Sequence, residues 1–261
     1  MENLLSKYSF DRITDPSWIV GQKDTMQILK NIVKTSLDSV AVMLVAPWGC
    51  GKSALAKYYA KLCVCQSRTV NNDPCLVCSD CLSVDMLQRT FYGAFSSATI
   101  HNARTELFYC DCSKMLVDDY KYLFKCLNQP SFFSESNMVI MEESQRASPQ
   151  IRDMFLLEIE RYRNIKWVFN VAQDGIGNVE DSLKQRTLML HLRIPSEKEI
   201  VELLGKICKR ENIAVEEAVL EIIAQYSDCR PRLSIQNLQK IILSGCAFIP
   251  DEVENILKAG R

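Results

Sequence analysis

The sequence has almost no net charge, few histidines and no long hydrophobic run. Its 261 residues carry 31 Lys and Arg against 32 Asp and Glu, a formal net charge of −1, so no overall positive field indicates nucleic acid. The longest apolar run, at residues 40–47, is too short to span a bilayer. Residues 1–12 lack the basic and apolar segments of a signal peptide. We therefore expect a cytoplasmic protein with no membrane partner.

Cysteine, in contrast, is abundant, with twelve residues. In a reducing compartment this number favours metal ligation over disulfides. Closely spaced thiolates favour tetrahedral Zn²⁺, and four protein ligands leave no open position for catalysis. We predict a structural zinc knuckle at about residues 63–82, with Cys63 as a competing first ligand. The predicted ligands are Cys65, Cys75, Cys78 and Cys81.

Strand-like apolar runs alternate with amphipathic helical segments up to about residue 194, and only helical patterns follow. The alternation predicts an α/β sheet domain over 1–194, and the remainder predicts a small helical domain over 195–261. Strands are expected at 40–45, 106–112, 137–141, 166–172 and 187–193. Helices are expected at 26–33, 53–63, 117–127, 148–161, 196–210, 215–226 and 232–244.

Residues 46–53, APWGCGKS, have the form of a phosphate-binding loop, G-x-x-x-x-G-K-[ST], with alanine at the first position. A buried strand precedes this loop and a helix follows it, which is the context that such a loop requires. Backbone N–H groups would hold the phosphates, Lys52 would neutralise the β- and γ-phosphate oxygens, and Ser53 would ligate Mg²⁺. The predicted nucleotide-binding residues of the loop are Pro47, Gly49, Cys50, Gly51, Lys52, Ser53 and Ala54.

The strand-like run MVIM ends in two acidic residues, Glu142 and Glu143. Nucleotide hydrolases hold Mg²⁺ and activate the attacking water at such a strand end, and here Glu142 takes the metal position and Glu143 the water position. Most of these sites have aspartate first. The longer side chain of Glu142 displaces its carboxylate, and Mg²⁺ demands strict geometry. We therefore expect nucleotide binding to survive and catalysis to be slower.

The order of these parts resembles the bacterial DNA polymerase III clamp-loader subunits, the gamma/tau family with its delta-prime relative, within the AAA+ ATPases. The resemblance covers roughly residues 8–245. It implies an AAA+ P-loop domain with a parallel central sheet and an inserted zinc knuckle, followed by a helical lid. It also implies ATP and Mg²⁺ beside Zn²⁺. The implied partners are other clamp-loader subunits in a ring-like oligomer, a sliding clamp and primer–template DNA.

Three further segments carry this resemblance. YSFDRITDPSWIVGQ resembles the segment that lines the adenine pocket, SLKQRTLMLHL the segment with the arginine finger, and SDCRPRLSIQNLQ the sensor 2 helix. The finger acts on a neighbouring subunit's nucleotide, and the sensor 2 arginine contacts the γ-phosphate. The residues implied are Tyr8, Ile19 and Val20 for adenine, Arg186 for the finger and Arg230 for sensor 2.

The sensor 1 position departs from the family. Alignment of KWVFNVAQ places Ala172 where the family has Thr or Asn, and Asn170 or Gln173 could serve instead. An additional stretch lies around residues 90–104, and the family's C-terminal collar is expected to be absent. The segments that would face DNA carry Lys114, Arg146 and Arg152, which would contact the duplex backbone rather than bases.

The leading hypothesis is an ATPase that loads a sliding clamp onto primer–template DNA during replication, in a bacterial cell or, for a phage protein, in its host. A second is a stator like delta-prime, which contributes Arg186 and the knuckle but hydrolyses little ATP. A third is an AAA+ ATPase of another DNA transaction. Lys52 and Ser53 favour the first hypothesis, whereas Glu142 and Ala172 favour the second.

Overall fold

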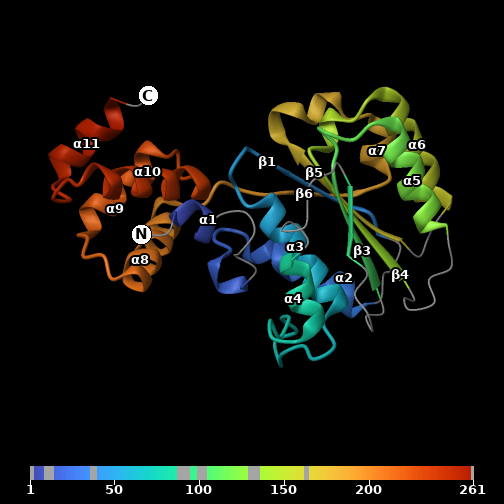
Figure 1. Ribbon diagram of the computed structural model, residues 1–261, viewed down its shortest axis with the longest axis horizontal. Coiled ribbons are helices and arrows are strands. Elements are labelled where there is room, and N and C mark those ends of the chain that lie inside the picture. Colours follow the sequence, from blue (N-terminus) through green and yellow to red (C-terminus); the bar gives the residue numbers. More distant parts are fainter. Residues whose placement is uncertain are drawn as a thin grey trace. The chain divides into compact units, whose positions relative to one another are not determined.

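The computed structural model describes residues 3–8, 15–35, 40–86, 95–98, 105–128, 136–161 and 165–259 (Figure 1). These residues form two compact units. The sheet unit contains the described residues of 24–47 and 55–192, and the helical unit those of 1–23, 48–54 and 193–261. His101 and most of the additional stretch around 90–104 lie outside the described residues.

The sheet unit is built on a six-stranded sheet with the order β2-β3-β4-β5-β1-β6. All neighbouring strands are parallel except β2, which runs antiparallel to β3 at one edge. The strands are β1 (Val42–Ala46), β2 (Phe95–Ala98), β3 (Thr105–Asp111), β4 (Ser136–Glu142), β5 (Ile165–Ala172) and β6 (Leu188–His191). The carboxyl ends of β1, β4 and β5, which carry the predicted motifs, therefore lie at the same end of the sheet.

Both faces of the sheet are covered, which explains why β1 and β5 are buried at every position. Alternate residues of neighbouring strands, such as Met43 and Val139, join one core cluster with residues of α5 (Val117–Leu127) and α6 (Pro149–Arg161). Figure 1 shows α2 (Lys23–Lys34) and α3 (Lys52–Val64) on the opposite side of the sheet from α5 and α6.

The helical unit has its own core, formed by the apolar faces of its helices. Its helices are α1 (Leu4–Tyr8), α8 (Glu197–Glu211), α9 (Glu217–Tyr226), α10 (Pro231–Ser244) and α11 (Pro250–Lys258). Ser196 and Glu199 form a capping box that starts α8. Asn212, in the left-handed conformation, ends α8.

The strands and helices expected from the sequence are present, with ends that differ by a few residues. Several elements were not predicted, among them α4 (Ser79–Met86), α7 (Asp181–Gln185) and the antiparallel strand β2. The sequence of β2, FSSA, is short and partly polar, so its own pattern does not indicate a strand. Its pairing with β3 makes it one. The start of α4 overlaps the cysteine span, where spacing rather than helical periodicity dominates the sequence.

Candidate nucleotide site and metal centre

The predicted phosphate loop joins the end of β1 to the start of α3. Gly49 and Gly51 have φ angles of 80° and 91°, which glycine adopts without steric cost. Lys52 is the first residue of α3 and is only 8% exposed, with Nζ 5.7 Å from the centroid of the Trp48 ring. The N-terminus of this thirteen-residue helix carries the partial positive charge that favours anions.

Two arginines of the helical unit lie against this loop. The backbone N–H of Arg232 donates to the carbonyl oxygen of Gly49 at 3.4 Å. A Cβ on Gly49 would lie 3.2 Å from Cβ of Arg232 and 3.9 Å from Cβ of Arg230, so a side chain here would crowd Arg232. Burial raises the pKa of Cys50, and the charges of Lys52 and Arg230 oppose this. The structure thus brings the loop and Arg230 together, and adds Arg232, which the sequence analysis did not single out.

The turn that presents Arg230 is conformationally unusual. Asp228 and Cys229 have φ angles of 47° and 52°, in the left-handed region that non-glycine residues rarely adopt. Arg230 is the N-cap of α10, and Pro231 is its first residue. Residues in such conformations cost about 1–3 kcal/mol each and cluster at functional sites. The strained turn is therefore consistent with a functional role for Arg230.

Tyr8, predicted near adenine, is buried in the helical unit. Its ring lies 5.4 Å from that of Trp18, and the guanidinium of Arg210 lies within 6 Å of both ring centroids. Its hydroxyl donates to Glu211, and burial is the main cause that raises the pKa of Tyr8. Val20 packs partly buried against the same core, and Ile19 is half-buried.

The acidic end of β4 is held by hydrogen bonds from elsewhere in the sheet unit. Nδ2 of Asn170, on β5, donates to Oε1 of Glu142 at 2.7 Å, and both side chains are buried. Glu143 follows with a φ of 55°, so the backbone leaves the strand direction at this residue. The geometry thus pairs Glu142 with Asn170, the residue named as a candidate for sensor 1.

Gln145 lies in the short 3-10 helix η2 (Ser144–Arg146) and bonds both to Glu143 and to the end of β5. Its Nε2 donates to Oε2 of Glu143 at 2.7 Å, and its Oε1 accepts from the backbone N–H of Ala172 at 3.2 Å. The sequence analysis did not single out Gln145. Its side chain bonds across 27 residues of sequence, a pairing that no local pattern indicates.

The predicted finger and DNA residues form contacts within the chain. Nη2 of Arg186 lies 2.5 Å from Oε1 of Glu160, and its Nη1 donates to the carbonyl of Ser182. The predicted DNA residues pair as follows: Lys114 with Asp111 at 2.9 Å, Arg146 with Glu143 at 3.7 Å, and Arg152 with the carbonyl of Asn178. Lys114 and Arg146 remain largely exposed, while Arg152 is half-buried.

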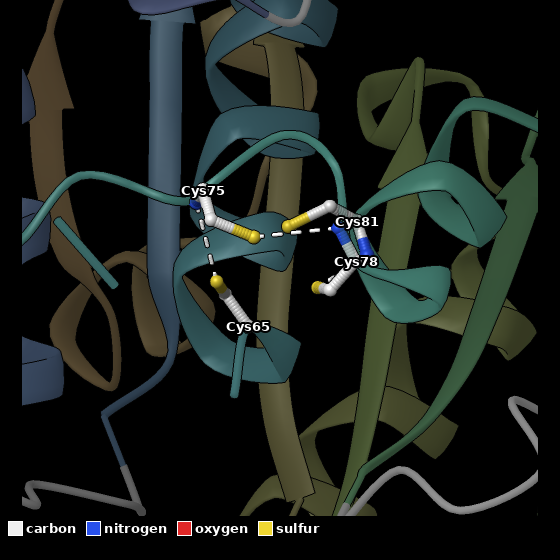
Figure 2. Close-up of side chains that lie close together, drawn as sticks. All are labelled: Cys65, Cys75, Cys78 and Cys81. Atoms are coloured by element: carbon white, nitrogen blue, oxygen red, sulfur yellow. Dashed lines mark hydrogen bonds between the residues drawn. The ribbon is translucent and has the colours of Figure 1, made fainter. Parts of the chain in front are cut away.

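The four predicted cysteines converge at one point, with their sulfur atoms all within 4.8 Å of one another (Figure 2). Cys65 follows α3 and Cys81 lies on α4. Among the described residues, Cys63 is not part of this group. A hydrogen bond from the backbone N–H of Val77 is the main cause that lowers the pKa of Cys75 to about 6. Four thiolates at Zn–S distances of about 2.3 Å would have their sulfurs about 3.8 Å apart, so the group fits tetrahedral zinc.

Polar contacts fasten the cysteine segment to the helices of the sheet unit. The hydroxyl of Tyr58 on α3 donates to Oδ1 of Asp73 at 2.7 Å, and Lys30 on α2 pairs with the same carboxylate at 2.8 Å. Lys61, 1% exposed, pairs with Asp85 on α4 at 2.8 Å. Side chains outside the cysteine group therefore tie this segment to α2 and α3.

The chain is similar to several DNA polymerase III subunits. It is 24% identical over 236 residues to DNA polymerase III subunit gamma of Buchnera aphidicola, which covers 90% of this chain and 59% of that protein. It is 24% identical to subunit gamma/tau of Mycobacterium bovis, over 88% of this chain and 37% of that protein. The chain thus spans less than two thirds of the length of these relatives.

No helix within the described residues is both long and apolar enough to cross a membrane.

The fold of the chain is also similar to that of solved structures. Thermotoga maritima RuvB, described as a Holliday junction branch migration motor, superposes with a TM-score of 0.60 at 15% identity, over 98% of this chain and 73% of RuvB. A single-residue variant of RuvB gives a TM-score of 0.63 at 14% identity, over 96% and 73%. The predicted AAA+ P-loop fold is confirmed. The family described as "DNA polymerase III, delta subunit" matches residues 21–168, more than half of the sequence, and the chain belongs to this family of clamp-loader AAA+ proteins.

Proposed function

We propose that the protein binds ATP·Mg²⁺ and hydrolyses it as a clamp-loader subunit that places a sliding clamp on primer–template DNA. The observation that carries this proposal is the phosphate loop, whose two glycines have positive φ and which has Arg230 and Arg232 against it within one compact unit. Similarity to gamma subunits over most of the chain supports the same assignment.

Each proposed role follows from the chemistry of a side chain. The amides of the loop and Lys52 bind the β- and γ-phosphates, and Arg230 binds the γ-phosphate from the lid. By the resemblance, Ser53 and Glu142 are the residues that would ligate Mg²⁺, and the ion would supply charge neutralisation. Glu143 accepts a proton from the attacking water as the general base.

Assembly supplies the remaining groups in this proposal. Arg186 completes the nucleotide site of a neighbouring subunit. Its ion pair with Glu160 must then break so that its guanidinium can bind the phosphate. Lys114, Arg146 and Arg152 contact the DNA backbone. The four-cysteine group holds zinc as a structural centre, because its donors are all thiolates and no fifth ligand is needed.

A second candidate function is a stator that binds nucleotide and donates Arg186 but turns over little ATP. The family match carries the delta name rather than gamma, which supports this candidate. Glu142 in place of aspartate, with one oxygen already paired to Asn170, supports it too. A role in another DNA transaction is the third candidate, in line with the branch migration motor among the similar folds.

Steady-state ATPase measurements of the purified complex, with primed DNA and the cognate clamp, test these candidates. The loader proposal expects DNA-stimulated turnover that Lys52→Ala and Glu143→Gln each remove, the second by about 10²–10⁴-fold. Bound nucleotide with no stimulated turnover would select the stator. Failure to co-purify with any sliding clamp would select another DNA transaction.

A further inference from the structure

The sensor 1 position of this chain has no functional group in its side chain. Ala172 carries only a methyl group, where the resemblance leads one to expect Thr or Asn. Asn170, the nearest candidate replacement on β5, already donates to Glu142. Gln173, the other candidate, is exposed. Besides Asn170, which is bonded to Glu142, a buried polar side chain at the carboxyl end of β5 would have to come from another element.

Gln145 places a side-chain amide at this end of β5. Its Oε1 accepts from the backbone N–H of Ala172 at 3.2 Å, and its Nε2 donates to the Glu143 carboxylate at 2.7 Å. The two partners fix the orientation of the amide, because a backbone N–H needs an acceptor and a carboxylate needs a donor. One side chain thus joins the proposed general base to the strand that lacks its expected polar residue.

The packing around Gln145 leaves this side chain little freedom. Gln145 is only 8% exposed. A Cβ built on Gly175, in η3 (Gln173–Asn178), would lie 2.4 Å from Cγ of Gln145, so only glycine leaves room for it. Ser144 anchors the same turn through a hydrogen bond from its hydroxyl to the carbonyl of Met141 at 2.9 Å.

Arg146 is a weaker alternative for holding Glu143. Its Nε lies 3.7 Å from Oε2 of Glu143, beyond ordinary hydrogen-bonding distance, and the side chain is 56% exposed. Exposed ion pairs of this kind are screened by solvent and contribute little. The buried amide of Gln145, at 2.7 Å, is the better restraint on the carboxylate.

We propose that Gln145 is a positioning residue that holds the Glu143 carboxylate for proton transfer and is itself anchored to the β5 backbone at Ala172. This inference rests on the proposed ATPase function. Gln145 bonds to Glu143 and to the β5 backbone rather than to the nucleotide. Its loss should therefore lower kcat while leaving KM and nucleotide affinity nearly unchanged.

The test compares Gln145→Leu with Gln150→Leu, the same substitution at an exposed position of α6. We expect Gln145→Leu to lower kcat by about 10²-fold, the cost of a misplaced catalytic group, with KM within about twofold. Gln150→Leu should behave as wild type. In Gln145→Glu, a second carboxylate beside Glu143 should move the acid limb of the pH–rate profile to higher pH.

A second pair of variants displaces Gln145 without changing it. Gly175→Ala puts a methyl group against its side chain, whereas Gly177→Ala in the same turn meets no atom within 4 Å. Only Gly175→Ala should lower kcat. Thermal unfolding of all variants shows whether each is folded at the assay temperature.

The outcomes separate this inference from the proposed function. If wild type turns over ATP and Gln145→Leu keeps kcat within about twofold, the inference is wrong while the ATPase assignment stands. If wild type shows no turnover in the complex, the ATPase assignment is wrong. Crystal structures of wild type and Gln145→Leu then decide: a Glu143 carboxylate in the same place in both overturns the positioning role, and a displaced one supports it.

Discussion

The phosphate loop and the acidic end of β4 differ in how their residues are brought together. The loop residues are consecutive, and its two glycines set the backbone of the turn. At the end of β4, Glu142 is held by Asn170, 28 residues away, and Gln145 bonds Ala172, 27 residues away. A short motif therefore specifies the first region, whereas sheet pairing specifies the second. The cysteine group resembles the loop, because its ligands lie within seventeen consecutive residues, 65–81.

Removal of the proposed zinc should have the largest effect on stability. Cys81 is fully buried, and its substitution by serine breaks a four-ligand site. We expect Cys81→Ser, or chelation of the wild type, to cost about 3 kcal/mol or more, which lowers Tm by roughly 6–12 °C. Zinc analysis and thermal unfolding check this, with Cys63→Ser as control. An unchanged Tm after chelation would exclude a structural metal.

The next effect concerns the long-range contact at the end of β4. Asn170→Leu removes the donor to Glu142 and leaves a buried carboxylate without it. We expect the free energy of unfolding to fall by about 1–3 kcal/mol. Urea denaturation gives this value, and Asn255→Leu, at an exposed position of α11, is the matched control. Equal losses in the two variants would show that the Glu142 contact contributes nothing.

A smaller change should separate nucleotide affinity from folding. Gly51 has a φ of 91° and no atom within 4 Å of an added Cβ, so Gly51→Ala introduces backbone strain alone. The strain is about 1–2 kcal/mol, and we expect ATP affinity to fall about tenfold as the loop relaxes. Gly205→Ala in α8 should leave affinity unchanged. A normal affinity in Gly51→Ala would mean that the loop conformation does not govern binding.

The smallest predicted effect concerns Glu199 in the helical unit, which belongs neither to the phosphate loop nor to the acidic end of β4. A hydrogen bond from Arg193 is the main cause that lowers the pKa of Glu199 to about 2. Its folded pKa lies below the unfolded value of about 4.3, so its contribution is complete above pH 4.5 and is lost as pH falls toward 2. Glu199→Gln should cost about 1 kcal/mol at pH 7, and the difference from wild type should shrink in acid.

Urea unfolding between pH 7 and 3 measures this dependence, with Glu202→Gln at an exposed position of the same helix as control. A difference between wild type and Glu199→Gln that stays constant over this range would contradict the lowered pKa of Glu199.

The sequence predicted what depends on local order. Helical and strand periodicity placed most elements, and α5 begins and ends where its pattern does. The spacing of Cys65, Cys75, Cys78 and Cys81 predicted a group that the structure brings together. The roles of these residues, and of Lys52 and Glu143, remain proposals.

The sequence did not predict contacts between residues that are far apart in the chain and meet only through strand pairing or the packing of distant segments. Gln145 and Arg232 carry no motif, and their positions follow from β4–β5 pairing and from the approach of α10 to Gly49. The antiparallel strand β2 was missed because its pairing with β3, rather than its own composition, makes it a strand.

The central claim, that the loop binds nucleotide, is tested most directly by calorimetric titration of the zinc-loaded chain with ATP·Mg²⁺. We predict saturable binding of one nucleotide, weakened at least about tenfold by Lys52→Ala because a charge-assisted contact to phosphate is lost. Absence of binding by the wild type, alone and with companion subunits, or equal affinity in Lys52→Ala, would contradict the account.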